Sequence, residues 1–243
     1  MKMNNIFKVV VLSVSLGLVS GAQAATYTYQ ITNPHGGDEA GDITQFSTSY
    51  NSDTQALSWQ STLTETNGVI ANSFWLVLSD GPDPMIDRNE YAILYGDSYS
   101  GNVAAYVYNG LNSGSSWNTP GEFIHNYGGV FETTETNVGE RTFSFSIDAS
   151  ILNSYLPTTP GTNDWDGVQF DETIGVWYHP AYIDKPASFN ADGSLLEFPE
   201  IVSGFFDLSE QYTVASVPEP SSLVLVGVGL IGLFARRQSK KYN

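Results

Sequence analysis

The sequence predicts an all-β protein whose body, residues 25–215, is an antiparallel β-sandwich of the jelly-roll type. The body is rich in Tyr, Phe, Trp, Val, Ile, Thr and Ser, residue types that suit half-buried, pleated surfaces. Apolar and polar residues alternate in several short segments, and turn-forming dipeptides separate these segments at short intervals. A body of about 190 residues is large enough for one domain with its own core.

Four segments alternate with the two-residue period of a strand that is buried on one face: Thr26–Ile31, Ala56–Leu63, Ala104–Tyr108 and Arg141–Ile147. Two further segments, Ser73–Leu78 and Ile174–Tyr178, are almost continuously apolar, which predicts central strands covered on both faces. Turns are expected at Asn67-Gly68, Asp80-Gly81, Asn109-Gly110, Asp166-Gly167 and Asp192-Gly193. The one helix expected in the body lies within Asp148–Tyr155, where Asp148 caps its first turn.

The N-terminus has the three parts of a secretory signal peptide. Lys2 and Lys8 flank the short, positively charged first part, and residues 9–19 are almost wholly apolar. Ala22 and Ala24 then fit the small-x-small pattern that signal peptidase cleaves. Residues 1–24 are therefore predicted to be a signal peptide with a helical apolar stretch, cleaved after Ala24.

The C-terminal tail, residues 216–243, has the order of a membrane-attachment signal. The tail contains the motif Pro218-Glu219-Pro220, and the chain from Ser216 to Pro220 is expected to be an exposed, non-helical segment, because proline fixes its own φ and restricts the residue before it. Residues 221–235 carry no charge and predict a single transmembrane helix, although a typical span needs about 20 residues. A basic cluster follows at Arg236, Arg237, Lys240 and Lys241. Positive charge marks the cytoplasmic side, so the body is expected outside and the C-terminus inside.

This tail resembles the PEP-CTERM tail of Gram-negative bacterial surface proteins, in which a Pro-Glu-Pro motif, one hydrophobic span and a basic cluster follow in this order. The resemblance implies recognition at Pro218-Glu219-Pro220 and processing by a membrane-embedded exosortase. It also implies an association with exopolysaccharide-producing bacteria. The signal peptide and the C-terminal span together predict a single-pass inner-membrane intermediate, followed by a final place at the cell surface or in the extracellular matrix. It transfers no biochemical activity, because the domains before such tails are diverse. A plain membrane anchor is the alternative.

The body is strongly acidic. Residues 25–217 contain three basic residues against 25 carboxylates, which is a net charge of −22. Such a surface repels nucleic acid, which we exclude as a partner, and it favours either solubility alone or the binding of divalent cations. The chain has no cysteine, so the exported body has no disulfide and its core must suffice.

Two acidic loops are candidates for Ca²⁺ binding, since calcium prefers six to eight oxygen ligands. The first loop has Asp80, Asp83, Asp87 and Glu90 within eleven residues, stiffened by two prolines. The second has Asp164 and Asp166 and resembles a fragment of an EF-hand loop without its later ligands. Ordinary turn chemistry is the alternative for both loops, because Asp and Gly dominate turns.

Four aromatic residues are candidates for stacking on sugar rings: Trp117, Trp165, Trp177 and Tyr178. Trp117 lies in the polar loop 111–121, which is long enough to be functional. Packing into the core is the alternative for each. His179 is the best single candidate for a polar site residue, with a packed core histidine as its alternative.

No catalytic residue is assigned. The absence of cysteine excludes thiol catalysis, and the three histidines show no metal-ligand spacing. The leading prediction is a non-catalytic, exported, exosortase-processed protein of the exopolysaccharide matrix. The alternatives are a carbohydrate-binding module, with or without calcium, and a glycan hydrolase, which requires two opposed carboxylates.

Overall fold

The structure is a computed structural model of the chain, and it describes residues 25–32, 41–79, 81, 84, 91–108, 121–158, 165, 167–170, 172–197, 199–203, 208–213 and 215–218. These residues form an all-β fold with antiparallel pairing throughout, as the alternation predicts. Within this described part, no helix has the length and apolar content that a membrane crossing requires. The predicted signal helix 1–24 and the predicted span 221–235 lie outside the described residues.

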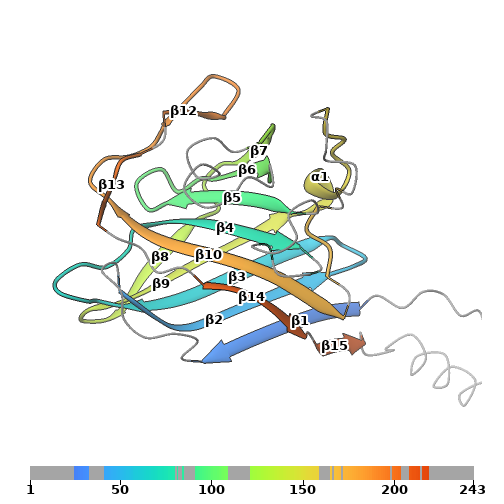
Figure 1. The fold of residues 1–243 in the computed structure, drawn as a ribbon, viewed down its shortest axis with the longest axis horizontal. Helices are drawn as coiled ribbons and strands as arrows, with labels where there is room; N and C mark the ends of the chain where they lie inside the picture. The colour runs from blue at the N-terminus through green and yellow to red at the C-terminus, as the bar shows by residue number, and fades with distance from the viewer. Residues whose placement is uncertain are drawn as a thin grey trace, which may run out of the picture.

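Two sheets make up the body (Figure 1). The first sheet has the order β15-β1-β2-β3-β9-β8, with bounds Ala215–Pro218, Ala25–Thr32, Asp42–Asn51, Ala56–Thr64, Glu140–Asp148 and Glu132–Asn137. The second sheet contains β10, β4, β5, β6 and β7, with bounds Thr173–Ile183, Ser73–Ser79, Ala92–Asp97, Val103–Val107 and Phe123–Tyr127. The outer edge of β10 pairs with two short strands, β13 (Ile201–Ser203) and β14 (Leu208–Thr213). A separate hairpin joins β11 (Ser188–Phe189) to β12 (Leu195–Glu197).

The connectivity differs from the jelly roll that the sequence predicts. Strands β1 to β3 and strands β4 to β7 follow one another as neighbours within one sheet, so each set is a meander. In a jelly roll the chain instead runs through two Greek keys. Several connections here are short, as between β2 and β3 or β5 and β6, and a short connection returns the chain to the adjacent position of the same sheet.

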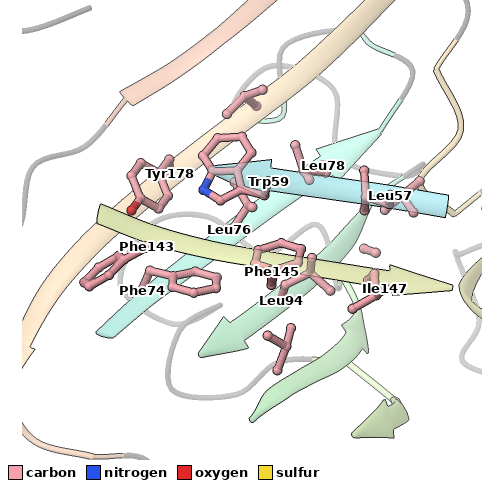
Figure 2. Close-up of a cluster of buried hydrophobic side chains, with 14 of the residues drawn as sticks. Leu57, Trp59, Phe74, Leu76, Leu78, Leu94, Phe143, Phe145, Ile147 and Tyr178 are labelled. Atoms are coloured by element: carbon pink, nitrogen blue, oxygen red, sulfur yellow. The ribbon is translucent and has the colours of Figure 1, made fainter. Parts of the chain in front are cut away.

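The main core lies between the two sheets. Large side chains from β3 and β9 meet those from β4, β5 and β10, as Figure 2 shows for the buried residues Leu57, Trp59, Phe74, Leu76, Leu78, Leu94, Phe143, Phe145, Ile147 and Tyr178. Phe74 stacks on Phe145 with ring centroids 5.8 Å apart, and Trp59 stacks on Phe46 at 5.0 Å. Each fully buried side chain of this size contributes roughly 1.5–3 kcal/mol of transfer free energy.

The prediction that two strands are covered on both faces is confirmed. Every residue of β4 is buried, and so is nearly every residue of β10. On the face turned away from the first sheet, a second apolar cluster includes Trp75, Tyr95, Tyr106 and Trp177. The β11–β12 hairpin covers part of this cluster, because Leu195 packs into it and the Leu195 N–H donates to the Tyr106 hydroxyl at 2.7 Å.

Two local predictions are also confirmed. Asn67 and Gly68 both have positive φ, 52° and 80°, and the flanking Thr66 and Val69 exchange two backbone hydrogen bonds, as in a type I′ turn. The short helix α1 spans Ser150–Asn153, within the predicted range. Its N-cap residue is Ala149, without a side-chain cap, and Asp148 lies one residue earlier, where its Oδ1 accepts from the Ser150 N–H at 2.9 Å. Hydrogen bonding from Ser150 lowers the pKa of Asp148.

Candidate functional site

The six acidic residues predicted to bind Ca²⁺ lie outside the described residues: Asp80, Asp83, Asp87, Glu90, Asp164 and Asp166. Among the residues that the structure describes, no group of three or more His, Asp or Glu side chains is arranged to hold a metal ion. The calcium sites therefore stay predictions. Two glycines next to these acidic residues, Gly81 and Gly167, have positive φ, 108° and 81°. This backbone conformation agrees with the turns expected at Asp80-Gly81 and Asp166-Gly167.

The prediction that Trp177 and Tyr178 contact a glycan is wrong, because both side chains are fully buried. They are adjacent on β10, so they point to opposite faces of a sheet that is covered on both sides. Trp177 belongs to the second apolar cluster, and Tyr178 belongs to the main core. Trp165 is partly buried and packs against the main core, whereas Trp117 lies outside the described residues.

His179 is also a core residue. Its side chain is buried and lies against Trp177, with ring centroids 5.1 Å apart. Burial lowers the pKa of His179 well below its usual value, so the imidazole is neutral at physiological pH. Its alternative interpretation, a packed histidine, describes this environment.

The outer face of the first sheet carries an array of hydroxyl and amide side chains, which we call the hydroxyl face. Its members are Thr28, Gln30, Ser47, Ser49, Ser58, Gln60, Ser144 and Ser146. They are the outward half of the alternating strands β1, β2, β3 and β9, whose inward half forms the core. None of these residues was singled out from the sequence.

Strand register places these side chains in rows. Thr28 is paired with Ser49, Ser49 with Ser58, and Ser58 with Ser146. Gln30, Ser47, Gln60 and Ser144 form the next row in the same way. Neighbouring strands lie about 4.7–4.9 Å apart and same-face residues about 6.7 Å apart, so donors and acceptors repeat in two directions. Within the first row, the Ser58 and Ser146 hydroxyl oxygens are 3.1 Å apart.

The hydroxyl face lines a hollow of about 700 Å³. Glu132 is the single carboxylate among the described residues that line it. This lining contrasts with a body that carries a net charge of −22. Among the described residues, the lining is thus a nearly uncharged, hydrogen-bonding surface on an acidic protein.

A second hollow of about 690 Å³ lies next to α1 and includes Tyr27, Tyr50, Gln55, Asn153 and Phe170 in its lining. Its amides already have partners within the protein. Asn153 Nδ2 donates to the Tyr50 hydroxyl at 3.1 Å and to Gln55 Oε1 at 3.2 Å, and Asn153 Oδ1 accepts from the backbone N–H of residue 168 at 2.9 Å. These bonds hold the loop after α1, and we assign Asn153 a structural role.

One sequence signal could have indicated the hydroxyl face. The outward positions of a solvated strand are commonly charged, but Ser58 and Gln60 of β3 and Ser47 and Ser49 of β2 are small or neutral. The signal becomes informative only when these strands are known to be neighbours in one sheet.

Comparison with known proteins identifies the tail. Residues 216–239 match a family model described as a PEP-CTERM protein-sorting motif. No curated protein and no solved structure matches the chain. The matched range contains Pro218, Glu219 and Pro220 and begins inside β15, immediately after Ala215. Apart from residues 216–218, it lies outside the described part, as do Arg236, Arg237, Lys240, Lys241, Ala22 and Ala24.

Proposed function

The chain carries a PEP-CTERM sorting tail, and we propose that it is an exported, exosortase-processed protein whose β-sandwich body is non-catalytic and resides in the exopolysaccharide matrix. The observation that carries the proposal is the match of residues 216–239 to the sorting motif, which begins within β15, the last strand of the sandwich. The proposed route runs through signal peptidase, a single-pass inner-membrane intermediate and exosortase.

The body suits this location. Its net charge of −22 favours solubility outside the cell and disfavours binding to nucleic acid or anionic lipid. Its core needs no disulfide, since two sheets bury large aromatic side chains between them. Both features support a passive, durable matrix component.

Tail variants in the producing organism test this function. Deleting residues 218–243 should abolish the membrane-attached precursor and change the final location of the body. Replacing Pro218, Glu219 and Pro220 with alanine keeps the hydrophobic span and should leave the protein membrane-attached and unprocessed. Immunoblots of membrane, surface and medium fractions report size and location. If both variants were processed and located like the wild type, the proposal would be refuted.

The hydroxyl face supports a second candidate function, the binding of a neutral polysaccharide. A sugar chain offers many hydroxyl groups, and the rows of Ser, Thr and Gln provide both donors and acceptors for them. A polyanionic polymer would meet the repulsion of the acidic body, so a neutral polymer is the better match. The candidate rests on the hollow of about 700 Å³ that these side chains line.

A plug in the hollow tests this candidate. Ser58→Trp would place a bulky ring at the centre of the hydroxyl face and should abolish retention of the exported protein on the organism's own exopolysaccharide. Thr133→Trp is the matched control, because Thr133 is an exposed strand residue of the same sheet that does not line the hollow. Equal retention of both variants would rule out the hydroxyl face as the binding site.

Two further arms of the same experiment separate the alternatives. Retention that requires millimolar calcium would point to the acidic loops around Asp80–Glu90 and Asp164–Asp166. Release of reducing ends from the polysaccharide would contradict the non-catalytic assignment.

A further inference from the structure

The first strand of the body is paired with the start of the sorting motif. β1 and β15 are antiparallel, and their register places Ala25 opposite Pro218, Thr26 opposite Val217, Tyr27 opposite Ser216 and Thr28 opposite Ala215. Figure 1 shows the two strands side by side at one edge of the first sheet. Ala25 is the first residue after the predicted signal-peptide cleavage, and Pro218 is the first residue of the Pro-Glu-Pro motif.

This pairing brings the two processing positions of the precursor together. Paired strands lie about 4.7–4.9 Å apart, so the predicted signal-peptidase product and the sorting motif leave the sandwich at the same corner. Both membrane-attached ends of the precursor can therefore be accommodated while the sandwich is folded. The body does not have to unfold to stay attached at both ends.

The same pairing keeps part of the sorting motif within the sheet. The family match begins at residue 216, so residues 216–218 belong both to the motif and to β15. One edge of β15 is bonded to β1, and in the described part of the chain no strand pairs with its other edge. Proteins that recognise an extended peptide bond its main chain and hold its alternate side chains in pockets. While β15 is part of the sheet, β1 already occupies one edge of its main chain.

We propose that β15 must separate from β1 before the sorting enzyme can act, so that the strand pair controls access to the motif. This inference rests on the proposed exosortase processing and adds the structural step that precedes it. The pair is suited to opening, because it lies at the edge of the sheet and joins only four residue pairs in the described part. Residues of β15 that remain after processing can pair with β1 again, which keeps the edge of β1 from being exposed to other chains.

A reversible cross-link tests the opening step in the full-length chain. The chain has no cysteine, so Thr26→Cys combined with Val217→Cys introduces the only thiols. Directly opposite residues of an antiparallel pair have Cα atoms about 4.5 or 5.5 Å apart, within the range that a disulfide spans. A second lock, Thr28→Cys with Ala215→Cys, leaves every residue of the matched motif unchanged. The expected result in the producing cells is loss of processing, with precursor accumulating in the membrane and restored processing on addition of a reductant.

Three controls make the outcome decisive. The single-cysteine variants show whether Val217→Cys alone harms the motif, and they should be processed like the wild type. A disulfide between Thr32→Cys and Gln45→Cys locks β1 to β2 in the same sheet but leaves β15 free, and it should not affect processing. Normal processing of both oxidised β1–β15 locks would overturn the proposal, and so would accumulation that a reductant does not reverse. Failure of the sorting function itself has a separate signature, since the tail deletion would then also leave size and location unchanged.

Discussion

A buried hydrogen bond joins the two sheets through the middle of the core. The hydroxyl groups of Ser61 on β3 and Tyr178 on β10 are 2.6 Å apart, and both side chains are fully buried. Burial also raises the pKa of Tyr178, so its phenol stays protonated. We expect that removing either hydroxyl alone destabilises the body by leaving the other one without this partner in an apolar environment.

The magnitude follows from the cost of an unsatisfied buried polar group. Ser61→Ala should lower the free energy of unfolding by about 1–3 kcal/mol, and Tyr178→Phe by a similar amount. Tyr178→Phe keeps the ring that packs against Trp59 and Phe74, at centroid distances of 5.2 and 6.1 Å, so its effect reports on the hydroxyl. The double variant removes both polar groups and should be less destabilised than the sum of the single variants, by about 1–2 kcal/mol.

Urea denaturation of the wild type and the three variants measures this coupling, provided that the slope of unfolding free energy with denaturant is unchanged. Additive effects of the two substitutions, within about 0.5 kcal/mol, would refute the argument that the bond joins the sheets.

Three further predictions concern single positions. Because the buried His179 resists protonation in the folded state while the unfolded state takes up a proton, the unfolding free energy should fall as the pH drops below about 6.5, by up to about 1.4 kcal/mol per pH unit. Unfolding curves measured between pH 5 and 8 should show this slope reduced in His179→Gln, and an unchanged slope would contradict it. Gly96→Ala places a Cβ 2.6 Å from the Phe74 ring and should destabilise the body by about 1–3 kcal/mol in urea; a neutral effect would mean that the ring moves without cost. Asp97→Ala removes the acceptor of the Tyr95 hydroxyl and of three donors from Tyr99 and Ser100, so thermal unfolding should reveal a loss of roughly 2–4 kcal/mol, with Asp97→Asn closer to the wild type. Equal losses for the two Asp97 variants would show that the acceptor oxygen does not matter.

Local sequence signals predicted much of the architecture. The two-residue period marked Ala56–Leu63 and Arg141–Ile147, which lie within β3 and β9, and the continuous apolar runs correctly identified β4 and β10 as strands buried on both faces. These predictions succeed because side-chain alternation is a property of a single strand and needs no knowledge of its neighbours. The Asn67-Gly68 turn is local in the same sense, since it depends on two residues that tolerate positive φ.

The glycan-binding hypothesis for Trp177 and Tyr178 failed because it went against the same signal. Both residues end the apolar run Ile174–Tyr178, which had predicted a strand covered on both faces. The structure places the main core on one side and the second apolar cluster on the other, so neither ring is available to a ligand. An aromatic residue indicates a binding surface only when the packing around it leaves its ring face exposed.

By itself, the sequence determined that the body is antiparallel and all-β, that it is strongly acidic, and that it carries a PEP-CTERM tail, because composition, periodicity and a contiguous motif are all read along the chain. Tertiary structure alone decided which strands are neighbours. That choice assembles the hydroxyl face from four strands. It also pairs Ala25 with Pro218, although almost the whole sequence of the body separates these two residues. The physical reason is that a period of two specifies which side of a strand is buried. Which strands become partners depends instead on which segments, far apart in the sequence, come together around a shared core.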